Sequence, residues 1–214
     1  MAAGLPGLER RFVGAGLVVS AAWSRDAAHA FVEDLFAKHH SEIHAYLVRM
    51  LRDPELAADL TQDAFVKAYR SYDTLVASEN ARAWLYRIAH RVALDELRRR
   101  RIVRFLPFTG EHRASAPSPE HLVMDLRLSG DLQRALERIP ERQRSALLLA
   151  ELHDLTGVEL ANALGVSHVA ARALLTRARE SLRQALAAER KAQAEAEARR
   201  DADRSDPRRE GRRS

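Results

Sequence analysis

The amino-acid sequence predicts an all-α protein made of two small helical domains joined by a flexible linker. Hydrophobic residues make up 46% of the 214 residues and charged residues 30%, while glycine and proline number only 9 and 7, a balance that favours long helices over strands and turns. Apolar residues recur at helical spacing from Phe31 to Arg101 and again from Leu122 to Ala188. Between these blocks, residues 102–121 contain Pro, Ser, Thr and Gly without a sustained period, which is typical of a linker.

Three or four helices are expected in the first block. The segment FVEDLFAKHHSEIHAYLVRML (31–51) has helical spacing and stops before Asp53 and Pro54. Asp53 is suited to cap the next helix and Pro54 to occupy its first turn, so a second helix is expected in DPELAADLTQDAFVKAYRSY. The polar stretch DTLVASEN (73–80) then predicts a loop before a third helix in RAWLYRIAHRVALDELRRRR (82–101).

The helix expected over 82–101 has two chemically different sides. At about 100° per residue its apolar side chains share one arc: Trp84, Leu85, Ile88, Ala89 and Val92. Another arc gathers the basic side chains: Arg87, Arg91 and Arg98, with His90 and Arg101 beside them. One side is suited to burial and the other to an anion, although simple solvation of the arginines is the commoner explanation for an isolated helix.

The second block contains a helix-turn-helix pattern in LTGVELANALGVSHVAARALLTRARESLRQAL (155–186). Thr156 and Glu159 match a capping box, Gly165 begins a tight turn, and Ser167 is suited to cap a second, longer helix. The second helix of this motif normally enters the major groove of DNA. Its apolar side is opposed by a polar row: Arg172, Thr176, Arg179 and Arg183. A helical hairpin with an arginine-rich outer face is the alternative interpretation.

The two ends of the chain lie outside this periodic core. Residues 1–29 are expected to form a mobile N-terminal extension, or to follow from a start codon assigned too far upstream. Within them RRFVGAGLVVSAAW (10–23) has the outline of a signal peptide but is too short to span a bilayer. Residues 189–214 are densely charged with both signs, so a fraying helix that becomes a disordered tail is predicted.

Composition also limits the chemistry. A net charge of +5 with arginine commoner than lysine favours phosphate recognition, and the lack of cysteine excludes disulfides, thiolate nucleophiles and Cys-ligated zinc. His40 and His44 lie one helical turn apart, but no Asp or Glu completes a plausible metal-ligand set around them. Since the sequence also contains neither a Gly-rich phosphate loop nor a Ser/His/Asp arrangement, we expect a cytoplasmic protein that is not an enzyme and uses no cofactor, metal or small-molecule substrate.

Several motifs in order resemble the extracytoplasmic-function (ECF) sigma factors, the group 4 members of the sigma-70 family of bacterial RNA polymerase. They are LRDPELAADLTQDAFVKAYRSY, ARAWLYRIAHRVALDELRRRR, a proline-containing linker, LERIPERQRSALLLAELHDLT, and then LANALGVS with LTRARESL. The resemblance covers about residues 30 to 188. It implies a region 2 domain at 30–101, a linker at 102–121 and a region 4 domain at 122–188.

The resemblance also implies partners and site residues. Core RNA polymerase would be bound at its clamp and flap, promoter DNA at its −10 and −35 elements, and an anti-sigma factor is an expected regulator. The clamp-binding residues would be Asp59, Gln62, Asp63 and Val66, which share a helix face opposite Leu60 and Ala64. The −10 residues would be Asn80, Trp84, Arg87, His90, Arg91 and Arg98. The −35 residues would be Ser167, His168, Arg172, Thr176, Arg179 and Arg183.

The sequence departs from the family pattern where DNA would be recognised. His90 and Arg91 stand where many relatives carry Arg-Asn, and residues 170–174 keep only the middle basic residue of a frequent Thr-Val-Lys-Ser-Arg pattern. Neither the −10 nor the −35 preference of relatives therefore carries over to this chain. Gly157, in place of a frequent aromatic or polar residue, is expected to loosen the turn before the helix-turn-helix.

Three other functions are compatible with parts of the sequence. A helix-turn-helix repressor or response regulator would bind duplex DNA unaided and would not be a polymerase subunit. An interaction module could occupy polymerase without directing initiation, although the basic faces of both domains argue against it. Catalysis is the third possible function, but the sequence lacks a recognisable catalytic arrangement.

Overall fold

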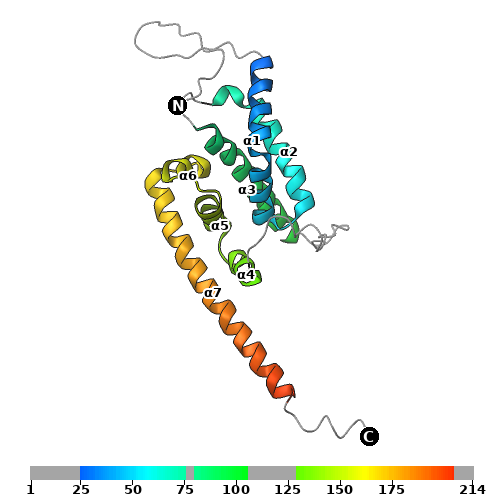
Figure 1. Ribbon diagram of the computed structural model, residues 1–214, viewed down its shortest axis with the longest axis vertical. Helices are drawn as coiled ribbons and strands as arrows, with labels where there is room; N and C mark the ends of the chain where they lie inside the picture. Colours follow the sequence, from blue (N-terminus) through cyan, green and yellow to red (C-terminus); the bar gives the residue numbers. More distant parts are fainter. Residues whose placement is uncertain (1–24, 76–79, 106–128, 205–214) are drawn as a thin grey trace.

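The computed structural model describes residues 25–75, 80–105 and 129–204, and the regular structure within these ranges is helical, which confirms the predicted fold class (Figure 1). The first half contains α1 (Arg25–Leu51), α2 (Pro54–Arg70), the 3-10 turn η1 (Tyr72–Thr74) and α3 (Ala81–Phe105). The second half contains α4 (Gly130–Arg138), α5 (Glu141–Leu147), the π-helical turn η3 (Leu148–Leu152), α6 (Gly157–Leu164) and α7 (His168–Arg204). Most of the expected N-terminal extension, most of the linker and the last ten residues of the expected tail lie outside the described residues.

Helices α1, α2 and α3 form a bundle around a common apolar core. The largest buried side chains of this core lie on α1 and α3: Ile43, Tyr46, Leu47, Met50, Trp84, Leu85 and Tyr86. The start of α2 is capped as predicted, because Asp53 Oδ1 accepts a hydrogen bond from the Leu56 backbone N–H at 3.1 Å. The other carboxylate oxygen of Asp53 pairs with Arg100 Nη2 at 2.7 Å, which ties the end of α3 to the start of α2.

The second half is built around the predicted helix-turn-helix. Thr156 and Glu159 form the capping box of α6, and Gly165 ends that helix with a φ of +65°, a left-handed conformation that favours glycine. Ser167 Oγ accepts a hydrogen bond from the Ala170 backbone N–H at 3.2 Å and so caps α7 as predicted. The capping box, the left-handed glycine and the serine cap together define the turn between α6 and α7.

Helix α7 continues into the segment where the sequence predicts a fraying helix before the tail. It runs to Arg204, and Glu189, the first residue of the expected tail, is only 3% exposed. Glu189 Oε2 accepts a hydrogen bond from Arg134 Nε at 2.9 Å, and Glu189 Oε1 forms an ion pair with Arg138 Nη2 at 2.5 Å, so both contacts hold α4 against this part of α7. Residues 189–204 are thus helical, and the first turn of this segment belongs to the second packed unit.

The two halves meet along α3. Figure 1 shows α5 and α6 beside α3, on the side of the first bundle away from α2. Helix α3 is consequently buried on more than one side, with Trp84, Tyr86 and His90 each 5% exposed or less. Among the described helices none is both long and apolar enough to cross a membrane.

Candidate polymerase and nucleic-acid interface

The predicted clamp-binding face of α2 is open to solvent. Asp59, Gln62 and Asp63 are exposed, and Val66 is 46% exposed, while Thr61 and Ala64 on the opposite side are fully buried. The face therefore displays two carboxylates, an amide and an apolar side chain together. A mixed acidic and apolar surface of this kind suits a protein partner better than it suits DNA.

The predicted −10 residues occupy three different environments. Asn80 caps α3, because its Oδ1 accepts from the backbone N–H groups of Arg82 at 2.9 Å and Ala83 at 3.3 Å. Trp84 is 1% exposed and packs in the core. Arg91 and Arg98 are exposed, with Arg98 Nη1 at 3.5 Å from Asp95 Oδ1, and Arg87 is half-buried. The roles of these residues at DNA stay predictions.

His90 lies in the interior, away from the basic arc where the helical wheel placed it. Its Nδ1 is 2.8 Å from Ser145 Oγ and 3.2 Å from Tyr46 OH, and the two hydroxyl groups are 2.7 Å apart. Burial, followed by the positive charges of Arg142 and Arg91, lowers the pKa of His90 to about 4. At neutral pH His90 is therefore an uncharged link between the two halves, and in this arrangement it is covered by α5.

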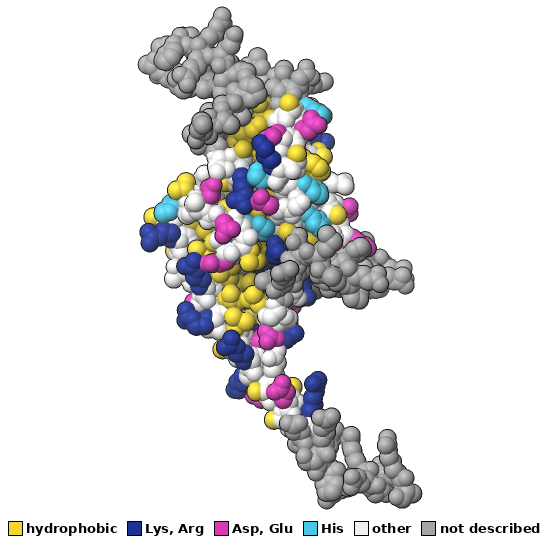
Figure 2. Space-filling model, viewed as in Figure 1, with side chains coloured by type: hydrophobic (Ala, Val, Ile, Leu, Met, Phe, Trp, Pro, Cys, Tyr) yellow, Lys and Arg dark blue, Asp and Glu magenta, His cyan; other side chains and the backbone are white. Residues whose placement is uncertain are grey.

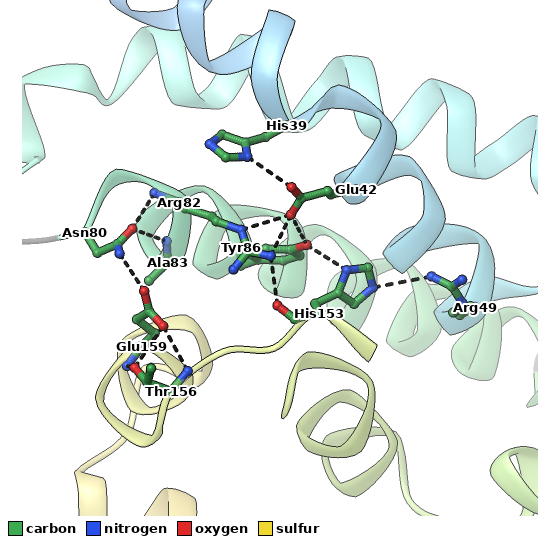
Figure 3. Close-up of polar contacts among 10 residues, drawn as sticks. All are labelled: His39, Glu42, Arg49, Asn80, Arg82, Ala83, Tyr86, His153, Thr156 and Glu159. Carbon is green, nitrogen blue, oxygen red and sulfur yellow. Dashed lines mark hydrogen bonds and ion pairs between the residues drawn. The ribbon is translucent and has the colours of Figure 1, made fainter. Parts of the chain in front are cut away.

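A second polar group at the same boundary, here called the junction cluster, contains Glu42, Arg49, Arg82, Tyr86 and His153 (Figure 3). Arg82 donates to Glu42 Oε2 through Nη2 at 2.7 Å and Nε at 2.9 Å, and its Nη2 also donates to the His153 carbonyl at 2.8 Å. Tyr86 OH lies 3.0 Å from Glu42 Oε2 and 2.8 Å from His153 Nδ1. One arginine thus joins a carboxylate of α1 to the backbone that follows η3.

The hydrogen-bond pattern of the junction cluster requires a neutral His153. Arg49 Nη1 is a donor 3.5 Å from His153 Nε2, so Nε2 must accept and the ring proton must lie on Nδ1. His153 Nδ1–H then donates to the Tyr86 oxygen, and Tyr86 O–H donates to Glu42. Burial, followed by the charge of Arg49, lowers the pKa of His153 to about 4, in agreement with this pattern.

Glu42 remains ionised at the centre of the junction cluster. Burial by itself would raise the pKa of Glu42, but the hydrogen bond and charge of Arg82, with smaller effects of Tyr86 and His39, lower it below its ordinary value. Burial and the neighbouring Glu42 carboxylate raise the pKa of Tyr86, which keeps its hydroxyl protonated as a donor. Each group is therefore in the protonation state that its partners need.

Asn80 connects the start of α3 to the helix-turn-helix. Its Nδ2 donates to Glu159 Oε1 at 2.5 Å, while Glu159 Oε2 accepts from the Thr156 backbone N–H at 2.8 Å. The same carboxylate thus completes the capping box of α6 and holds a residue predicted to bind the −10 element (Figure 3). Together with His90, this contact shows that part of the predicted −10 surface faces the second half of the protein.

The predicted −35 residues line the solvent side of α7 and differ in their partners. Ser167 is committed to its cap, and Thr176 Oγ1 donates to the Arg172 carbonyl at 3.0 Å. Arg179 Nη2 pairs with Glu151 at 2.6 Å, and Arg183 pairs with Glu180. Within the described ranges, the side chains of His168 and Arg172 carry no ion pair or hydrogen bond. Arg172 is therefore the guanidinium of this row most available to a ligand.

Sequence patterns did not indicate the junction cluster or the Tyr46–His90–Ser145 group. Tyr46 and Ser145 are 99 residues apart, and no helical period links positions at that separation. One signal was present in α3, where Tyr86 and His90 lie outside the apolar arc and carry polar groups that need partners when they are buried.

Comparison with known proteins agrees with the order of these elements. Residues 35–102 match the family description sigma-70 region 2, and residues 129–182 match sigma-70 region 4. The ECF RNA polymerase sigma factor SigE of Mycolicibacterium smegmatis is 31% identical over 175 residues, which cover 80% of this chain and 68% of that protein. RNA polymerase sigma factor YlaC of Bacillus subtilis is 31% identical over 163 residues, covering 75% of this chain and 94% of that protein.

Solved structures share the fold. The sigma factor RpoE of Bartonella quintana, determined with the anti-sigma factor NepR, superposes with a TM-score of 0.54 at 24% identity over 73% of this chain and 96% of that one. CnrH, determined with the cytosolic domain of CnrY, gives a TM-score of 0.54 at 25% identity over 77% of this chain and 95% of that one. The helical arrangement of both halves therefore has precedents in experimentally determined proteins.

Proposed function

Because the chain belongs to the extracytoplasmic-function sigma factors of the sigma-70 family, we propose that it binds core RNA polymerase and directs initiation at promoters with its own −35 and −10 elements. The observation that carries this proposal is the succession, in one chain, of a region 2 match and a region 4 match whose helix-turn-helix has every predicted cap. A stand-alone repressor would need the second match but not the first.

We propose the domain boundaries that the sequence suggests, with an extension of each domain. Region 2 occupies 30–101 and region 4 occupies 122–188, joined by the linker 102–121. Burial of Glu189 and its pairs with α4 support adding the next turn of α7 to region 4. Because α1 begins at Arg25 and Ala28 is buried, residues 25–29 belong with region 2, so the segments before Arg25 and at the end of the chain are the candidates for regulation.

The acidic face of α2 is proposed to bind the polymerase clamp, and region 4 to bind the flap. Exposure of Asp59, Gln62, Asp63 and Val66 on one face supports the first contact, since the clamp would meet charge and apolar surface together. This face lies on α2, away from the junction with the second half. Clamp binding therefore does not require the two halves to separate.

Unlike clamp binding, DNA binding requires the two halves to separate. The −35 side of α7 is exposed, but Asn80 and His90 contact the second half, so full access to the proposed −10 surface requires region 4 to move away from α3. We propose that polymerase and promoter binding favour this separated arrangement. An anti-sigma factor, the partner in the RpoE complex, would act by preventing it.

Catalysis is proposed to reside in the polymerase and not in this chain. Sigma factors position promoter DNA, and the exposed groups described above are suited to recognition. The place of action would be the cytoplasm, where polymerase and chromosome meet.

Run-off transcription with purified bacterial core polymerase tests this function. Templates are genomic promoter fragments, including the region upstream of the protein's own gene, and transcripts are compared with and without the protein. Asp63→Lys should lower transcript yield by weakening clamp binding. Glu197→Lys makes the same charge change at an exposed α7 position outside the matched regions, and should leave the yield unchanged.

DNA binding by the protein alone separates the two candidate functions. A sigma factor should give promoter-specific transcripts with polymerase and bind duplex promoter weakly by itself. A repressor should bind its operator unaided, with an affinity that falls steeply with salt, and reduce transcription. The second result would retain the helix-turn-helix and refute the role as a polymerase subunit.

A further inference from the structure

Exposed valines gather around the turn of the helix-turn-helix. Val169 is 77% exposed and Val158 63%, the two highest values among the exposed large hydrophobic residues of the described chain, and Val166 is 37% exposed. Figure 2 shows hydrophobic, histidine and basic side chains together at the left edge of the molecule, over the α6–α7 turn. The exposed apolar surface of region 4 is thus concentrated at the end expected to face DNA.

Val169 lies in the first turn of α7 and has no visible role in packing. The residues that hold α7 to the domain are on another side, where Ala171 and Ala178 are fully buried. A β-branched side chain is also a weaker helix former than alanine, which occupies both following positions. Neither stability nor helix propensity explains a valine here, whereas the first residues of the second helix are the ones that reach base edges in this motif.

Two arginines of the predicted −35 row further along α7 form ion pairs with carboxylates. Arg179 pairs with Glu151 and Arg183 with Glu180, which leaves Arg172 as the exposed guanidinium of the predicted −35 row without an ion pair in the described structure. Val169 and Arg172 are three residues apart and therefore neighbours on the helix surface. The first turns of α7 thus present the apolar side chain of Val169 beside the guanidinium of Arg172, which can donate two hydrogen bonds.

A close contact fixes the direction of this first turn. A Cβ atom at Gly157 would lie 2.8 Å from His168 Nε2, so the imidazole of the residue before Val169 rests against the start of α6. Gly157 therefore permits this close approach, while the looser turn expected from the sequence stays a prediction. Val169 projects from a helix start held by the Ser167 cap and the His168 contact.

We propose that Val169 is a specificity-determining residue that contacts the 5-methyl group of a thymine in the −35 element, beside a guanine bound by Arg172. Apolar side chains distinguish thymine through this methyl group in the major groove, and arginine pairs with guanine O6 and N7. The inference rests on the proposed function, because it assigns base recognition to region 4 of a sigma factor.

Deoxyuridine scanning tests the methyl contact directly. Once run-off transcription has identified a promoter, each thymine of its −35 region is replaced singly by deoxyuridine, which removes only the methyl group. Transcription with the unaltered protein should fall about fourfold at one thymine, the effect of losing one buried methyl contact. Val169→Ala should lower transcription on the thymine template and abolish the difference between the two templates.

Two further variants make the result specific. Val169→Ile keeps an apolar side chain and should keep the sensitivity to deoxyuridine. Val158→Ala removes the same atoms from the exposed valine of α6, and this variant should also keep the sensitivity to deoxyuridine. Circular dichroism of each variant confirms that α-helix content is unchanged.

The outcomes separate this inference from the function on which it rests. Equal sensitivity of the unaltered protein and Val169→Ala to deoxyuridine, or no sensitive thymine at all, would overturn the role of Val169 while leaving a functional sigma factor. A protein that supports no transcription from any fragment would overturn the proposed function, and the inference with it.

Discussion

Acidification should lower the free energy of unfolding because two histidines are buried where the two halves meet. His90 and His153 each have a pKa lowered to about 4, against an ordinary value of 6.5, so both are neutral in the folded, closed protein. Unfolding, or separation of the halves, exposes them to water and restores the ordinary pKa. Their contribution to stability is therefore complete above pH 6.5 and is lost as the pH falls from 6.5 towards 4.

The size of the effect follows from these pKa values. Between about pH 7.5 and about pH 5, each histidine should lower the free energy of unfolding by about 2 kcal/mol, or about 4 kcal/mol together. Glu42 contributes little over this range because its pKa lies below its ordinary value of 4.5. Urea unfolding followed by circular dichroism at the two pH values measures the difference.

Two sets of variants isolate the histidines from the other titrating groups. Combining His90→Gln with His153→Gln should lower stability at about pH 7.5 but remove most of the difference between the two pH values. His29→Gln is the matched control, because this side chain is 73% exposed and should leave the pH dependence intact. If the double variant loses as much stability on acidification as the unaltered protein, burial of neutral histidines is not the cause.

Three further predictions concern single positions, each measured as the change in free energy of urea unfolding. Gly165→Ala should destabilise by about 1 kcal/mol, since alanine is disfavoured at a φ of +65°, and no loss would contradict the left-handed turn. Asp53→Ala should cost at least about 1 kcal/mol, because it removes both the cap of α2 and the ion pair with Arg100. Asp34→Ala, at an exposed site with one helical ion pair, should cost under about 0.5 kcal/mol. Glu189→Gln should cost about 1 to 3 kcal/mol because two arginines lose their buried anion. A negligible change would show that these ion pairs do not hold α4 against α7.

Local chemistry explains why much of the fold was predictable. Asp53, Thr156 and Gly165 each act within a few residues of their own position, through a cap or a left-handed turn, and each forms the structure that its neighbours in the sequence indicate. The exposed faces of α2 and α7 were predictable for a similar reason, since helical period alone determines which side chains share a face.

The junction was not predictable because it depends on how two separate units dock. A helical wheel for α3 assumes one buried side, and it placed His90 among the arginines. Packing of α5 against a second side of α3 buried His90 instead. The contacts of Glu189 with α4 were not predictable for the same reason, because low-complexity charged sequence does not show which residue pairs with a distant helix.

The length of α7 places its far end well away from the junction between the two halves. Its 37 residues correspond to a rod of about 55 Å, with the end predicted to bind the −35 element at His168 and the contact with α4 near its middle. Because α7 is continuous and is paired with α4 near its middle, movement of region 4 away from α3 would carry the far end of the helix with it. A fluorophore near Arg200, paired with one on α2, would therefore report in real time whether region 4 stays docked on α3 or departs when polymerase binds.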